Sequence, residues 1–135
     1  MFVEKRKHIR LNIQLEANIQ SENGNTYDGK TKNISFGGLF LLMSPAEDIN
    51  EGDSCNVTLL LNNEDSGHSI PLLFKCNVIH RREKGYGLQF ICIDGLEAYS
   101  HFEKLMVFNS DDPDRLMAEL DKHPGLIVKK DNCFS

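Results

Sequence analysis

The sequence has no long apolar run. A helix that crosses a membrane needs about 20 consecutive apolar residues, and no segment of the 135 residues approaches that length. Where a signal peptide would have an apolar core, the first 15 residues carry Glu4, Lys5, Arg6, Lys7 and Arg10. We therefore expect one soluble domain that stays in the cytoplasm and does not bind a membrane.

Closely spaced metal ligands are also missing. The four cysteines, Cys55, Cys76, Cys92 and Cys133, include no Cys-x-x-Cys pair, and the five histidines show no metal-ligand spacing. The sequence thus predicts no metal site, no cofactor and reduced thiols.

Catalytic motifs are absent as well. Ser35 is not the centre of a Gly-x-Ser-x-Gly elbow. Gly37 and Gly38 are followed by leucine rather than by the Lys-Ser/Thr pair of a phosphate-binding loop. No histidine forms a recognisable catalytic motif with a nucleophile in the sequence. We predict that the chain is not an enzyme.

The charge balance is acidic, with one local exception. The net charge of −5 argues against a surface that neutralises the phosphates of DNA or RNA. No aromatic stripe is present on which the bases of a single strand would stack. Residues 5–10, however, read Lys-Arg-Lys-His-Ile-Arg and form a basic arm in an acidic protein.

Hydrophobic periodicity predicts a mostly β domain. Apolar and polar residues alternate strictly from Leu11 to Gln20, which indicates a half-buried strand, and Asn23-Gly24 is a strong hairpin signal. Further strands are expected at about 26–34, 39–43, 55–61, 70–80 and 86–93. Short, evenly spaced strands joined by hairpin turns favour an antiparallel barrel or sandwich.

After the last of these strands, the apolar residues recur with the period of a helix. Leu96, Tyr99, Phe102, Leu105 and Met106 recur every three or four residues, which predicts an amphipathic helix from 96 to about 108 that closes an open end of the barrel. Asp112-Pro113 begins a second, short helix that ends at His123. The remaining residues form a tail or a short added strand.

Two polar features suggest ligand binding. Arg6-x-x-x-Arg10 places two guanidinium groups on one side of the arm, where they suit phosphate oxygens or the O6/N7 edge of guanine. Asn33-x-Ser35-x-x-Gly38 offers an amide, a hydroxyl and an open backbone at a turn between strands. Taken singly, the first feature is also explained by a solvated arm and the second by an ordinary turn. As a pair, at the two ends of one hairpin, they are more specific.

The pair resembles the signature of the bacterial PilZ domain, the cyclic di-GMP receptor module. The similarity extends to Glu4-Lys5-Arg6, to Gly37-Gly38-Leu39-Phe40-Leu41 and to Gly85-Tyr86-Gly87-Leu88-Gln89-Phe90, and so covers about residues 4 to 108. It implies a six-stranded antiparallel β-barrel with a C-terminal helix, to which this chain adds a short extra helix. The PilZ-like domain would span 1–110 and a helical extension 111–135.

The resemblance also implies the site. Arg6 and Arg10 would hold guanine and phosphate, with Asn33, Ser35 and Gly38 on the other side of the guanine pocket. Lys5, beside the first arginine, favours two stacked ligand molecules over one. Where the family often has aspartate, Asn33 offers one acceptor oxygen instead of two, a difference of about 1 kcal/mol in binding.

The expected function is therefore that of a receptor without enzymatic activity. Cyclic di-GMP would draw the self-repelling arm over the barrel and so change the surface offered to an unidentified protein partner. The chain itself would be a monomer or homodimer. Two alternatives remain: a degenerate PilZ-type adaptor that binds only protein, and a small β-barrel that binds nucleic acid.

Overall fold

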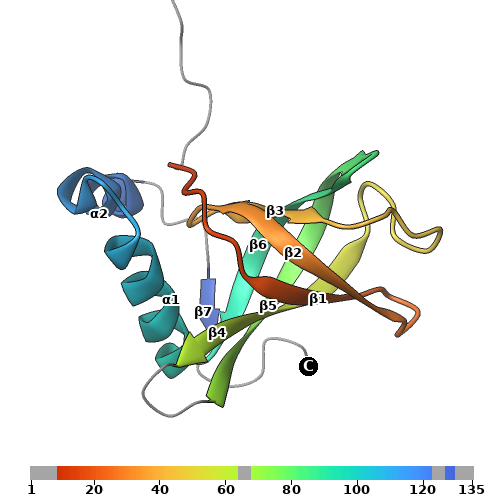
Figure 1. Ribbon diagram of the computed structural model, residues 1–135, viewed down its shortest axis with the longest axis horizontal. Coiled ribbons are helices and arrows are strands. Elements are labelled where there is room, and N and C mark those ends of the chain that lie inside the picture. The colour runs from red at the N-terminus through yellow and green to blue at the C-terminus, as the bar shows by residue number, and fades with distance from the viewer. Residues whose placement is uncertain (1–8, 64–67, 123–126, 130–135) are drawn as a thin grey trace, which may run out of the picture.

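The computed structural model describes residues 9–63, 68–122 and 127–129. Its elements are β1 (Glu16–Gln20), β2 (Thr26–Ile34), β3 (Gly38–Leu42), β4 (Ser54–Asn63), β5 (His68–Arg82), β6 (Gly85–Asp94), α1 (Leu96–Phe108), α2 (Pro113–Lys122) and β7 (Ile127–Lys129). Figure 1 shows a strongly twisted barrel with both helices at one end. The second helix and the added strand agree with the sequence prediction.

Pairing between β3 and β6 closes the barrel. The sheet order is β3-β2-β1-β4-β5-β6, all antiparallel, and Gly38–Leu42 of β3 pairs in turn with Gly85–Gln89 of β6. Closure leaves β2, β3, β6 and β5 as consecutive neighbours on one side. β7 pairs in parallel with the far end of β6. The six-stranded antiparallel barrel expected from the sequence is thus confirmed.

The helix α1 fills the end of the barrel through one aromatic side chain. Phe102 is fully buried, and its ring lies 5.6 Å from Phe36, 5.2 Å from Phe74 and 5.6 Å from Phe90, measured between ring centroids. These edge-to-face contacts add to the burial of apolar area. Leu96, predicted to lie on the buried stripe, is 55% exposed at the first position of the helix.

The first strand is shorter than the alternation predicts. β1 begins at Glu16, whereas the pattern began at Leu11. The reason lies in Thr31, whose hydroxyl donates to the Ile13 carbonyl at 2.6 Å and accepts the Leu15 N–H at 2.8 Å. The hydroxyl thus takes the place of a backbone partner for two groups, although the Leu15 carbonyl still accepts the Thr31 backbone N–H at 2.9 Å. The alternation of burial continues, but the strand does not.

The cysteines depart in part from the prediction. Cys55 and Cys76 are free, buried and directly opposite each other on β4 and β5, and burial raises the pKa of the Cys76 thiol. Cys92 is disulfide-bonded, so the expectation of reduced thiols is wrong at that position. In the described ranges no three metal-ligating side chains come together, and no helix is long and apolar enough to cross a membrane.

Asp48 ties the loop after β3 to the β1–β2 hairpin. Its carboxylate accepts hydrogen bonds from the Tyr27 hydroxyl at 2.6 Å, the Ser21 hydroxyl at 2.7 Å and the Asn25 amide at 2.9 Å. These hydrogen bonds lower the pKa of Asp48 from 3.8 to about 2, and the bond from Tyr27 has the largest effect. The same contact raises the pKa of Tyr27.

We expect this carboxylate to make folding stability depend on acidity. Because the pKa is lower in the folded protein than in the unfolded chain, the contribution of Asp48 is complete above about pH 4 and is lost as the pH falls through about 2. Asp48→Asn should lower the urea midpoint at neutral pH and flatten its decline over that range. Asp28→Asn, at an exposed position on the same hairpin, is the control. Identical acid profiles for wild type and Asp48→Asn would contradict this role.

Candidate functional site

The corner between β2 and β3 is closed by Ser35. Its hydroxyl accepts the N–H groups of Gly37 and Gly38, both at 3.1 Å, and donates to the Gly38 carbonyl at 3.2 Å. The Ser35 N–H donates to the same carbonyl at 2.8 Å. These bonds use the one proton and both lone pairs of the hydroxyl. Ser35, 8% exposed, therefore shapes the corner.

Gly38 is required by the closure of the barrel. A Cβ at this position would overlap the carbonyl oxygen of Leu88 on the neighbouring strand β6. The sequence interpretation gave the missing side chain a different purpose, the approach of a ligand. In the structure the backbone of β6 occupies that space, while the Gly38 backbone remains at the corner.

The arm meets this corner through one antiparallel bridge. The Leu11 N–H donates to the Ile34 carbonyl at 2.8 Å, and the Ile34 N–H donates to the Leu11 carbonyl at 2.9 Å. The bridge brings Arg10, which is exposed, beside the segment from Asn33 to Ser35. Arg6 and Lys5, the other cations of the predicted site, lie outside the described residues.

A row of four residues crosses the outer face of the barrel next to Asn33. Asn33 pairs with Phe40 of β3, Phe40 with Gly87 of β6, and Gly87 with His80 of β5. Leu39, Leu41, Tyr86 and Leu88 point into the core, so the alternating residues Phe40 and Gly87 face outward. Three interstrand spacings of about 4.8 Å make this outer row about 14 Å wide.

The outer row is flat at Gly87 and carries a positive charge over Phe40. Gly87 has no side chain, and the His80 ring lies against it, with Cδ2 3.1 Å from the position that a Cβ would take. The Lys32 ammonium lies 6.0 Å from the centroid of the Phe40 ring. Within the described part of the chain, the Asn33 side chain has no hydrogen-bond partner. A planar ring could rest on this row with a free amide at one end.

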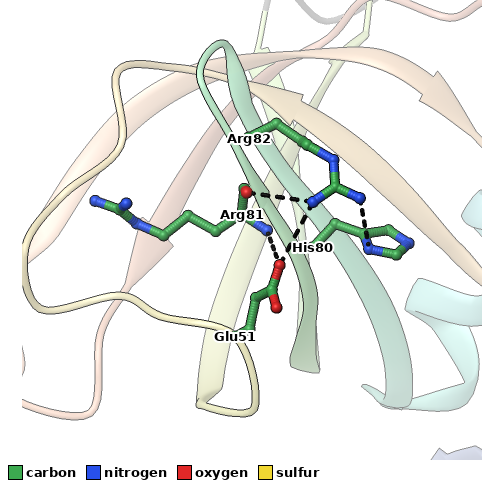
Figure 2. A network of polar contacts seen from close by, with 4 residues as sticks. All are labelled: Glu51, His80, Arg81 and Arg82. Carbon is green, nitrogen blue, oxygen red and sulfur yellow. Dashed lines mark hydrogen bonds and ion pairs between the residues drawn. The ribbon is translucent and has the colours of Figure 1, made fainter.

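A network of polar contacts orients His80. Figure 2 shows the Arg82 guanidinium between Glu51 and His80: its Nη1 is 3.5 Å from the Glu51 carboxylate and its Nη2 is 3.3 Å from His80 Nδ1. The Arg81 N–H donates to the same carboxylate at 3.0 Å. Since arginine only donates, His80 Nδ1 accepts, and a neutral ring carries its proton on Nε2. These exposed contacts add little stability, but they fix the direction of the ring.

Sequence reasoning missed the outer row. The sequence places Gly87 and His80 on strands, and Gly87 within the PilZ-like stretch, but it gives neither residue a role in the site, because nothing local shows which strand lies opposite which. The glycine in Gly85-Tyr86-Gly87 was the one available signal, since a glycine inside a strand often marks a close approach. The structure also has a polar depression between the β1–β2 turn and β4, lined by Gln20, Ser21, Glu22, Gly24, Ser54, Cys55, Asn56 and Lys75. Of the predicted site residues that the structure describes, none lines that depression.

Comparison with solved structures gives barrels of the same kind. The chain is similar to the inhibitor of motility MotI/DgrA of Bacillus subtilis (TM-score 0.57, 20% identity, 73% of this chain and 47% of that one). It is similar to the PilZ domain of CeSA from a cellulose-synthesizing bacterium (TM-score 0.56, 17% identity, covering 72% of this chain and 93% of that one). The PilZ domain of YcgR from Escherichia coli, solved with c-di-GMP (cyclic di-GMP), gives a TM-score of 0.50 at 13% identity. The match covers 87% of this chain and 88% of that one.

These similarities establish the fold, and the family follows from the sequence model. The chain spans about half the length of MotI/DgrA, so it corresponds to part of that protein. No curated protein matches the chain significantly. The model of the PilZ domain matches residues 4–106, which include the arm, the corner and the outer row. The chain belongs to the PilZ domain family.

Proposed function

We propose that this chain is a cytoplasmic, non-enzymatic receptor for cyclic di-GMP. Arg6 and Arg10 hold guanine and phosphate oxygens, and Asn33, Ser35 and Gly38 form the facing corner, with Lys5 next to the first arginine. The ligand suits these groups because it carries two phosphates and two guanines, which are the partners of guanidinium groups.

The outer row is the observation that carries the proposal. It lies beside the bridge that fixes Arg10, and its width of about 14 Å is enough for a dinucleotide rather than a single base. Phe40, Gly87 and His80 give a guanine ring a surface to stack on, and Asn33 offers it an amide that has no partner among the described residues. A ligand with planar bases and negatively charged phosphates requires a flat surface with cations beside it, and the outer row and the arm offer both.

The relay to a protein partner follows from charge. Lys5, Arg6, Lys7 and Arg10 repel one another in the free protein, and two ligand phosphates offset that repulsion. The arm then closes over the outer row, and the chain, as monomer or homodimer, presents a different surface to its partner.

Titration of the wild-type protein tests both steps. We expect calorimetry with cyclic di-GMP to give saturable binding, with a stoichiometry of two ligands if Lys5 acts as proposed. We expect trypsin to cut after Lys5, Arg6 and Lys7 more slowly in the bound protein, because an ordered arm is a poor substrate. Cyclic di-AMP, which lacks the guanine O6, is the control ligand. Equal cleavage with and without bound cyclic di-GMP would reject the ordering of the arm.

The adaptor that binds only protein stays as the second candidate, and one observation favours it. Ser35 and Gly38 have complete structural explanations in the turn and in the closure of the barrel, so neither residue requires a ligand. No heat of binding in the wild-type titration would select this alternative.

A further inference from the structure

The base of the arm contacts a helix that lies beyond the PilZ match. The backbone N–H of Ile9 donates to Glu119 Oε2 at 3.0 Å, which joins residues 110 positions apart. Glu119 belongs to α2, whereas the family model ends at residue 106. Figure 1 shows α2 near the point where the described chain begins. The contact falls one residue before Arg10.

The helix α2 is fixed firmly enough to position what it touches. Leu116 is 1% exposed and belongs to the hydrophobic core. Asp112 caps the helix: its Oδ1 accepts the Arg115 N–H at 3.2 Å, and Pro113 takes the first helical position. Leu116 and Glu119 are three residues apart, so they share the face that is turned towards the barrel.

Arg10 is thereby held from both sides. Ile9 is bonded to α2 and packs against the core, while Leu11 is bonded to Ile34 of β2 in both directions. The backbone on either side of Arg10 is therefore fixed, which sets the direction in which its side chain leaves the barrel. Without the Glu119 carboxylate, the Leu11 bridge would be the remaining hydrogen-bonded restraint among the described residues beside Arg10.

We infer that Glu119 is a positioning residue of the ligand site and that α2 is part of the binding apparatus. This assignment rests on the proposed function, because it concerns the affinity of the same site. Glu119 acts by accepting the Ile9 N–H, so that Arg10 meets the ligand from a fixed backbone and less freedom is lost on binding.

Three variants test the assignment in calorimetric titrations with cyclic di-GMP. Glu119→Ala should weaken binding about fivefold, the effect of one hydrogen bond. Glu119→Gln should bind within about twofold of the wild type, because its amide oxygen still accepts the N–H. Glu47→Ala, an exposed loop residue with the same change of charge, should bind like the wild type. Hydrogen exchange by NMR should show the Ile9 amide protected in wild type and Glu119→Gln, and unprotected in Glu119→Ala.

The outcomes separate this assignment from the proposed function. If the wild type binds and Glu119→Ala binds equally well, the assignment alone is rejected. If Glu119→Gln binds more tightly than the wild type, the carboxylate competes with the ligand for the arm, and the positioning role is rejected. If the wild type does not bind, the proposed function falls, and this assignment with it. Thermal unfolding of each variant verifies that the fold is intact.

Discussion

Replacing Arg10 with alanine is expected to weaken cyclic di-GMP binding about 50-fold while leaving the fold intact. The guanidinium is exposed, and no ion-pair partner for it is found within the described ranges, so the folded state loses no contact there. In the complex it would supply a pair of charge-assisted hydrogen bonds, whose loss costs about 2 to 3 kcal/mol. Calorimetry measures the affinity, and circular dichroism the fold.

Arg115→Ala is the matched control for this change. It removes the same charge from an exposed position on α2, whose capping bond uses only the Arg115 backbone N–H. A purely long-range electrostatic effect would weaken binding similarly in both variants. A contact at the site weakens it only in Arg10→Ala. A loss of less than threefold in Arg10→Ala would remove this residue from the proposed site.

Gly38→Ala is expected to destabilise the protein by at least about 3 kcal/mol, whether or not ligand is present. The added methyl group would overlap the Leu88 carbonyl, which belongs to the backbone of β6 and cannot turn aside. Overpacking against a rigid neighbour typically costs about 1 to 3 kcal/mol or more, and here it acts on the pairing that closes the barrel. Urea unfolding measures the loss.

Gly24→Ala provides the comparison for Gly38→Ala. Gly24 has a positive φ of 89° and nothing within 4 Å of an added Cβ, so alanine there meets only backbone strain of about 1 to 2 kcal/mol. The expected order is therefore a larger loss at Gly38 than at Gly24. Wild-type stability in Gly38→Ala, combined with lost binding, would restore the interpretation that this glycine admits the ligand.

Most of the fold could be predicted because its signals are local. Alternating burial has a period of two residues wherever a strand has one face in the core, and Val57, Leu59, Leu72 and Phe74 obey it. The change of period at Leu96 marked the helix. The first strand was predicted too long because alternation reports burial, whereas a strand also needs backbone hydrogen bonds to its neighbour. Here the Ile13 carbonyl and the Leu15 N–H bond to the Thr31 hydroxyl instead.

The candidate site could be predicted only in part. The arm and the corner are visible as motifs because each is continuous in the chain. Ser35 and Gly38 were identified correctly as residues of the corner, but their contacts to the turn and to Leu88 became clear only from the structure.

The sequence by itself determined an antiparallel β domain closed by a helix, a basic arm and a polar corner, since composition, spacing and period are properties of neighbouring residues. Only the tertiary structure decided which distant residues join them. Strand register sets Phe40, Gly87 and His80 beside Asn33, and the packing of Leu116 carries Glu119 to Ile9. Register and helix docking depend on pairings across the whole chain, and no single segment encodes them.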